Sequence, residues 1–270
     1  MIFKSNRTKV FTGILLLFFM SIKFCNAQFP YAISAKTDYS LIGIGALSLT
    51  VGQVISNNVS AYSIDELENL NANQVNNFDQ QTINRYSETS STLSKGVLLG
   101  TGMATLTLLA DKSIRNKWAT IGVMGMEVLM ITYGVSSVTK SSVLRARPYA
   151  YNNNVPIEIR QGIDARYSFF SRTTAATSAM SFFSAKVFTD MYPNSKWKPV
   201  VWTAAVLLPA VSGYLKVDAG EHFTTDVMVG YTFGAVIGYL VPVLHLQKEV
   251  AKAYWHIEPS LNGLALRVEF

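Results

Sequence analysis

The sequence predicts an all-α protein, a bundle of six helices followed by a short C-terminal β-hairpin. Long apolar runs recur along the 270 residues, and 49% of all residues are hydrophobic. Glycine, alanine and serine are frequent in these runs, which allows helices to approach closely. A strand-like alternation of apolar and polar residues occurs only near the C-terminus. We therefore expect helices alone to build the core.

Six segments carry the helical pattern. Five are apolar runs, at residues 41–55, 96–110, 118–138, 199–215 and 227–246. The sixth, residues 172–188, alternates small and apolar residues with helical spacing. Only 118–138 and 227–246 comfortably reach the about 20 residues of a membrane span, and Glu127 interrupts the first of them. A soluble bundle is therefore an alternative to a membrane-embedded one.

Residues 57–94, between the first two runs, are polar and rich in Asn and Gln. Within this segment, Ser63 and Glu66 in "SIDELENL" have the spacing of a helix capping box, which predicts a short helix. We expect the rest to be an exposed, solvated loop.

The C-terminal "WHIEPSLNGLALRVEF" predicts a hairpin. Asn262-Gly263 is a turn signal, and apolar residues alternate with others from Leu264 to Phe270. The chain thus divides into a signal segment (1–27), a first helix with the polar segment (28–95), a core (96–247) and a tail (248–270).

The first 27 residues have the pattern of a secretory signal. Basic residues precede the apolar run "VFTGILLLFFMSI", and the small Cys25 and Ala27 precede a cut before Gln28. The 13-residue run is short for an uncleaved anchor, the alternative. Cleavage would remove four basic residues and no acid, so the net charge would fall from +6 to +2. It would also remove the only cysteine, and with it any disulfide or thiolate metal site.

Loop charge bears on orientation. If the last five helices cross a membrane and 41–55 does not, the basic "DKSIRNKW" and "NSKWK" both face the cytoplasm, as the positive-inside rule prefers. Residues 140–171 and 216–225 then lie on the exported side. If 41–55 also crosses after a cleaved signal, the orientation inverts and the rule is broken. We expect a membrane-embedded or membrane-docked bundle whose functional face is periplasmic.

His222 and Asp226 are the first candidates for chemistry. Four residues apart at the start of the last helix, they share one helix face. The carboxylate can accept one ring N–H and leave the other nitrogen as a nucleophile. The alternative is that Asp226 only caps the helix. Of the other two histidines, His245 lies roughly 28 Å away at the far end of that helix, and His256 lies beyond the bundle.

Three basic residues complete a candidate anion site. Lys140 and Arg147 are seven residues apart, Pro148 is expected to end the preceding helix, and Lys216 lies six residues before His222. Cations that converge on a histidine suit phosphate, to which a guanidinium can bind at two points. Each cation alone could instead be a solvated charge at a helix end.

These segments resemble, in order and spacing, the first and third motifs of the type 2 phosphatidic acid phosphatase (PAP2) and vanadium haloperoxidase superfamily. "KSSVLRARP" keeps the lysine and the Arg-Pro pair in Lys140 and Arg147. "LKVDAGEHFTTD" has Lys216 where the family has arginine, with His222 and Asp226 on the matching positions. The resemblance implies a PAP2-like bundle in which this histidine attacks phosphate and forms a phosphohistidine.

The middle motif departs from the family pattern Pro-Ser-Gly-His. Here the segment is "FSRT", which retains Ser171 as a phosphate-binding position but has Phe170, Arg172 and Thr173 at the other three. Threonine cannot serve as the general acid, and loss of that acid costs roughly 10²–10⁴ in rate. At a helix start, Arg172 could strengthen phosphate binding, exclude the ligand or point to solvent.

Three functions remain open. The first is an exported or membrane-associated phosphatase for a phosphomonoester or diphosphate, lipids included, weakened by the missing acid. The second is a non-catalytic phosphate- or phospholipid-binding protein, and the third a vanadium haloperoxidase, which also relies on the missing histidine. No cofactor, metal or nucleic-acid partner is expected.

Overall fold

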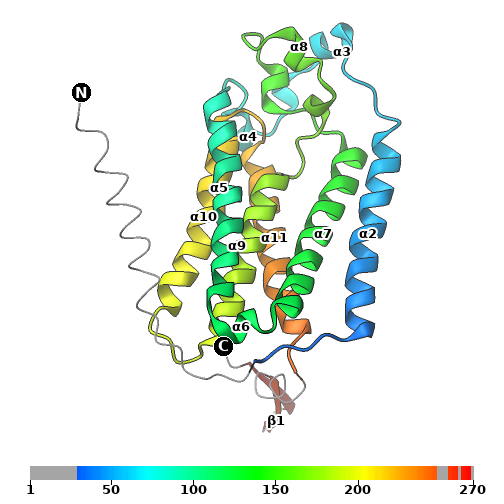
Figure 1. Cartoon of the computed structure of the whole chain (residues 1–270). Helices are drawn as coiled ribbons and strands as arrows, with labels where there is room; N and C mark the ends of the chain where they lie inside the picture. Colours follow the sequence, from blue (N-terminus) through cyan, green and yellow to red (C-terminus); the bar gives the residue numbers. More distant parts are fainter. Residues whose placement is uncertain (1–28, 248–254, 261–262, 269–270) are drawn as a thin grey trace, which may run out of the picture.

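A bundle of six long helices forms the body of the computed structural model, which describes residues 29–247, 255–260 and 263–268 (Figure 1). The helices are α2 (Ala35–Ser56), α5 (Glu88–Leu106), α7 (Trp118–Val143), α9 (Arg172–Met191), α10 (Lys198–Asp218) and α11 (Thr224–Leu244). Each overlaps one of the six segments predicted above, so the prediction of an all-α bundle is confirmed.

Short helices connect the long ones. They are α3 (Ile64–Glu68), η1 (Ala72–Gln74), α4 (Asn77–Gln80), η2 (Thr107–Ala110), α6 (Lys112–Arg115), η3 (Pro148–Tyr151), α8 (Ile157–Arg160) and η4 (Ile163–Arg166). The predicted capping box of α3 is confirmed, because Ser63 and Glu66 exchange side chain–backbone hydrogen bonds. The predicted polar segment ends earlier than expected, since Ser87 caps α5 and residues 88–94 are helical.

Residues 57–87 and 144–171 fold together over one end of the bundle, at the top of Figure 1, and we call them the polar cap. Tyr62 and Leu67 from the first segment pack against Tyr149 and Val155 from the second. Asp79 is fully buried. Most residues of 57–87 are exposed, as expected of a solvated loop, but the few that are buried attach the segment to the second one.

Small residues let the central helices touch backbone to backbone. A Cβ added to Gly234 of α11 would lie 2.1 Å from the carbonyl oxygen of Ala175 in α9. One added to Gly238 would lie 2.1 Å from that of Ala179. This close approach fixes how α11 and α9 meet, and the candidate site lies where both helices begin.

Helix α7 ends before the position that its proline predicts. Leu144 adopts a left-handed conformation with φ of 49°, which terminates the helix four residues ahead of Pro148. Pro148 instead opens η3. Residues 145–147 are therefore outside the helix and pass across the end of the bundle.

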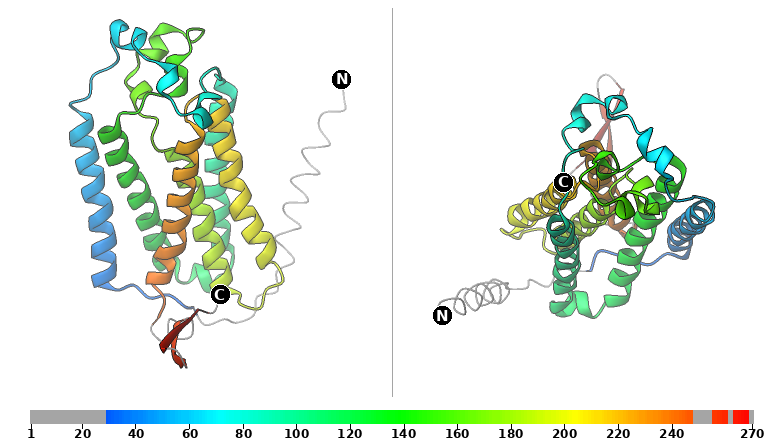
Figure 2. Two further views of the ribbon diagram at one scale, coloured as in Figure 1. Left: turned by 180° about the vertical axis from the view of Figure 1, so that it is seen from behind. Right: turned by 90° about the horizontal axis from the view of Figure 1, so that it is seen from above.

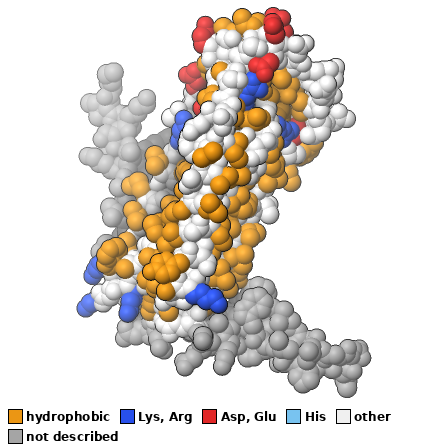
Figure 3. All heavy atoms as spheres, turned by 90° about the vertical axis from the view of Figure 1, so that its right-hand side faces the viewer, with side chains coloured by type: hydrophobic (Ala, Val, Ile, Leu, Met, Phe, Trp, Pro, Cys, Tyr) orange, Lys and Arg blue, Asp and Glu red, His pale blue; other side chains and the backbone are white. Residues whose placement is uncertain are grey.

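Five helices, α2, α5, α7, α10 and α11, are long and apolar enough to cross a membrane. Figure 3 shows hydrophobic side chains along the flank of the bundle, basic ones at its lower end and acidic ones at the cap. The assumption that 41–55 does not cross is not supported, because α2 is 22 residues long and runs the length of the bundle beside α7.

Two strands, β1 (Trp255–Ser260) and β2 (Gly263–Val268), pair antiparallel beyond the end of α11. The predicted turn at Asn262-Gly263 falls partly outside the described residues, so the hairpin as a whole stays a prediction. The predicted signal at 1–27 also lies outside them.

Candidate active site

Four of the predicted site residues meet beneath the polar cap. Lys140 lies in the last turn of α7 and Lys216 in that of α10. Arg147 follows α7, and His222 lies in the short connection between α10 and α11. The positive charges of all three cations act on the ring of His222. The site is therefore a buried imidazole within a ring of cations.

A backbone carbonyl fixes the ring of His222. Its Nδ1 lies 2.6 Å from the carbonyl oxygen of Ser168, and since a carbonyl only accepts, Nδ1 carries the proton. Burial lowers the pKa of His222 well below its usual value, and the three neighbouring cations lower it further. The ring is therefore neutral near pH 7, with the lone pair of Nε2 available as a nucleophile.

Asp226 does not contact that ring directly, contrary to the prediction from their spacing. Its Oδ2 is 4.0 Å from Nδ1 of His222. The carboxylate accepts from the Ser168 hydroxyl at 2.5 Å, the Phe223 amide at 2.9 Å and Arg145 at 2.5 Å. Ser168 thus connects the pair, because its carbonyl binds the ring while its hydroxyl binds the carboxylate.

Arg145 and Asp79 support this arrangement, and the sequence analysis missed both. The guanidinium of Arg145 bridges two buried carboxylates, Asp226 and Asp79, the latter at 2.9 Å. Asp79 also accepts from the amide of Thr225 at 3.0 Å and from its hydroxyl at 2.6 Å. Burial opposes the ionisation of Asp79, but the hydrogen bonds from Thr225 and Arg145 outweigh it and keep its pKa below the usual value.

The carboxylate of Glu221 pairs with two of the four cations predicted to bind phosphate. Its Oε2 lies 2.6 Å from Nζ of Lys216 and 3.3 Å from Nη1 of Arg147, and Ser91 donates to the other oxygen. Burial opposes its ionisation, but the charges of Arg147 and Lys216 prevail and lower its pKa to about 2. Glu221 is thus an internal anion that pairs with two of the residues predicted to bind phosphate.

The cations keep some capacity for a further anion. Nε of Arg147 is buried and has no hydrogen-bond partner among the described residues. Lys140 donates to the carbonyl oxygen of Tyr167 at 2.5 Å, which leaves an ammonium group two further protons to share.

The residues of the middle motif lie differently from the prediction. Ser171 is fully buried, caps α9 and pairs its hydroxyl with that of Thr174 at 2.9 Å. Arg172 points toward α7, where Nε lies 3.4 Å from Ser136 Oγ and the guanidinium 5.8 Å from the ring centre of Tyr133. Arg172 therefore lines a hollow between α2 and α7, while its charge still acts on Lys140 and Arg147. No described contact of the Thr173 side chain replaces an acid.

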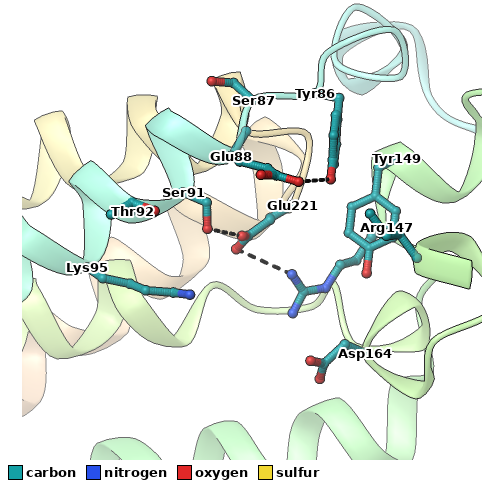
Figure 4. A pocket seen from close by; sticks show the side chains of 12 residues that line it. Tyr86, Ser87, Glu88, Ser91, Thr92, Lys95, Arg147, Tyr149, Asp164 and Glu221 are labelled. Carbon is teal, nitrogen blue, oxygen red and sulfur yellow. Dashed lines mark hydrogen bonds and ion pairs between the residues drawn. The ribbon is translucent and has the colours of Figure 1, made fainter. Parts of the chain in front are cut away.

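A cavity of about 330 Å³ leads from the edge of the polar cap to Arg147 and Glu221 (Figure 4). The ammonium group of Lys95 points into it, and Asp164 and Tyr149 line the side of Arg147. The cavity provides a polar approach to the cations.

Glu221 should compete with a bound anion, so we expect Glu221→Gln to bind vanadate about tenfold more tightly than the wild type. Loss of one opposing charge at a buried pair is readily worth the 1.4 kcal/mol or so that this factor requires. Isothermal titration calorimetry with vanadate measures it. The matched control is Glu88→Gln, since Glu88 lines the same cavity but contacts Tyr86 instead of the cations. Weaker binding by Glu221→Gln would mean that Glu221 positions the cations for the anion.

Fold and site together define a class: a helical bundle, with the features of a membrane protein, that holds a neutral histidine among cations at one end. Residues 123–249 match the sequence model of the PAP2 superfamily. The chain therefore contains a PAP2 superfamily domain. This range includes Lys140, Arg147, Lys216, His222 and Asp226.

One solved structure with similarity is the first transmembrane PAP2 type phosphatidylglycerolphosphate phosphatase from Bacillus subtilis. The TM-score is 0.38 at 16% identity, over 75% of this chain and 94% of that one. No curated protein sequence matches the chain significantly.

Proposed function

We propose that the protein is a phosphatase of the PAP2 type, which hydrolyses a phosphomonoester or diphosphate, lipid phosphates included, through a phosphohistidine. The observation that carries the proposal is the state of His222, a neutral ring with a free Nε2 lone pair, on which the charges of three nearby cations act. A buried nucleophile among cations suits an attack on an anionic phosphorus centre.

In the first step, a bond forms between Nε2 of His222 and phosphorus while the bond from phosphorus to the leaving oxygen breaks. The ring becomes cationic, and the carbonyl of Ser168, backed by the charge of Asp226, stabilises it. Water then attacks phosphorus, the N–P bond breaks and inorganic phosphate leaves. Glu221 must release Lys216 and Arg147 for the substrate to reach them.

The leaving oxygen needs a proton, and Thr173 cannot provide it near neutral pH. His245 cannot substitute, since it lies at the opposite end of the bundle. We propose that water supplies this proton, which favours substrates whose leaving group is a weak base.

We therefore expect an aryl phosphate to be hydrolysed at least about 10² times faster than an alkyl phosphate of similar size. Phosphate release by the purified protein in detergent measures both rates. Arg172→Gly combined with Thr173→His restores the Gly-His pair of the family pattern. The double variant should hydrolyse alkyl phosphates faster, which lowers the ratio of the aryl to the alkyl rate. Similar rates for both substrates in the wild type, dependent on His222, would reveal another acid.

A non-catalytic phosphate-binding protein is the second candidate, favoured by the carboxylate of Glu221 on the cations. It predicts that vanadate raises the melting temperature while no substrate yields inorganic phosphate. The same assays decide between the two functions.

We also propose that the five apolar helices cross the membrane together with α9, which is mostly buried against four of them, and that the basic end lies in the cytoplasm. The exposed Lys112, Arg115 and Lys196 lie in the short connections at the end opposite the polar cap, where the positive-inside rule places them in the cytoplasm. Residues 140–171 and 216–225 then face the exported side. In this orientation residue 29 lies on the cytoplasmic side. A signal cleaved after residue 27 would leave that residue on the exported side, so the proposed orientation is incompatible with the predicted cleavage.

Cysteine labelling in intact cells tests this orientation. An impermeant maleimide should label a cysteine introduced at Asn153, in the polar cap, and should spare one at Lys117. The reverse pattern would support the cleaved signal and a site that faces the cytoplasm.

A further inference from the structure

Three ionisable side chains meet at the end of the bundle opposite the candidate active site. Asp38 lies in the first turn of α2, Glu127 in α7, and His245 directly after α11. One possible ligand atom from each lies within 4.8 Å of the other two, and all three side chains are buried. The phosphatase proposal uses none of them.

The ring of His245 is held with Nε2 toward the two carboxylates. Its Nδ1 lies 2.8 Å from the carbonyl oxygen of Val241, so Nδ1 carries a proton. Nε2 lies 2.8 Å from Oδ1 of Asp38 and 3.3 Å from Oε2 of Glu127. A neutral ring would therefore turn its lone pair toward two anions, an arrangement that requires a positive charge between them.

The carboxylates also lack donors. Both oxygens of Glu127 and Oδ2 of Asp38 are buried without a hydrogen bond, and among the described residues they are three of the four such side-chain atoms. A buried carboxylate oxygen without a partner is costly, and it marks a place where a ligand completes the structure. These oxygens and Nε2 converge on one region.

The formal charges of the three side chains show how much positive charge is needed to neutralise them. Two carboxylates and a neutral imidazole sum to −2, which one divalent cation neutralises. Two protons would also neutralise it, one on Nε2 of His245 and one on Glu127, which could then donate to Asp38. Nε2 lies 3.3 Å from Glu127 Oε2 but makes no hydrogen bond to it, so the carbonyl oxygen of the protonated Glu127 would still lack an aligned donor. A cation with direct bonds to all three side chains leaves fewer groups unsatisfied.

We propose that Asp38, Glu127 and His245 bind a divalent transition-metal cation, Zn²⁺ or Mn²⁺. One imidazole and two carboxylates suit these ions, whereas Mg²⁺ and Ca²⁺ prefer oxygen ligands alone. The 3.3 Å between Nε2 and Glu127 Oε2 fits two bonds of about 2.0–2.1 Å at a tetrahedral angle, and Asp38 Oδ1 needs a shift of about 0.5 Å. This proposal departs from the expectation that the protein holds no metal.

The site would join three helices that are far apart in the sequence. Helix α2 lies at the edge of the bundle beside α7 (Figure 2), and the metal would tie its first turn to both α7 and the end of α11. The metal is therefore structural, and its loss should loosen α2 without removing the nucleophile at the other end.

The test uses the full-length protein in detergent, stripped with a chelator and then titrated with Zn²⁺, Mn²⁺ or Mg²⁺. We expect about one equivalent of Zn²⁺ or Mn²⁺ to be retained after desalting. We also expect the melting temperature to rise by about 5–10 °C at a hundredfold excess over Kd, and Mg²⁺ to have no effect.

Glu127→Gln keeps the side-chain shape and should abolish both retention and the thermal shift, whereas Glu158→Gln, an exposed carboxylate of the polar cap, should change neither. If Glu127→Gln fails to fold, His245→Gln provides the same comparison. Visible absorption of bound Co²⁺ gives an independent readout of an imidazole–carboxylate ligand set. Retention of no metal by the wild type, or equal retention by Glu127→Gln, would overturn the proposal and leave the two-proton arrangement.

Discussion

Replacement of His222 by alanine is expected to reduce phosphate release at least about 10³-fold for every substrate. In the proposed mechanism the substitution removes the atom to which phosphorus bonds, and the nearby cations and carboxylates, which pair with each other, cannot replace it. The melting temperature should change much less than the rate, which separates lost chemistry from lost folding.

The matched control is His256→Ala, a histidine of β1 at the other end of the molecule, which should retain wild-type rates. Rapid quenching under alkaline conditions should trap phosphate on the wild type and not on His222→Ala, because phosphohistidine survives base. Residual activity within tenfold of the wild type would exclude His222 as the nucleophile.

Replacement of Arg145 by methionine should lower the free energy of unfolding by about 3–5 kcal/mol. Methionine fills a similar volume but leaves Asp79 and Asp226, both with fully buried carboxylates, without their shared cation. Thermal and denaturant unfolding in one detergent measures the change. The control Arg85→Met removes the ion pair with Asp218, in which both side chains are more than a third exposed, and should cost about 0.2–1 kcal/mol.

The pH dependence of the free energy of unfolding distinguishes the loss of these ion pairs from a loss of packing alone. The pKa of Asp79 is lower in the folded protein than in the unfolded chain. Its contribution to the free energy of unfolding is therefore complete above the pKa of the unfolded chain, and it is lost as the pH falls through the pKa of the folded protein. The hydrogen bond from Thr225 lowers this pKa most and Arg145 comes next, so without Arg145 part of the lowering disappears, and the stability difference between variant and wild type should shrink below about pH 4. A difference that stays constant down to pH 3 would argue for packing alone.

The six helices and the cations around His222 could be predicted from the sequence alone. Apolar runs of helical length can be buried in only a few ways, so the pattern predicts the bundle. Fixed spacing between a helix end and the following loop then brings Lys140, Arg147 and Lys216 to one end of that bundle.

Other parts of the site could not be predicted because their partners are remote or belong to the backbone. Asp79 binds Thr225, 146 positions away, and its surroundings have the composition of an ordinary polar loop. The ring of His222 is held by the carbonyl of Ser168, a group that every residue type has in common. The position of Glu221 directly before His222 could have drawn attention to it, since an acidic residue is unexpected among cations. Its pairing with Lys216 and Arg147 depends on side-chain rotamers, which the sequence does not show.

The buried position of Asp79 has a practical consequence for work with fragments of this protein. The matched range 123–249 begins within α7 and omits α2, α5 and the loop that carries Asp79. A fragment cut at those limits would keep every motif residue, yet Arg145 would have one carboxylate fewer and Thr225 would lose its acceptor. The part of this chain that matches the family is thus smaller than the part that supports Asp226 and Thr225 beside His222.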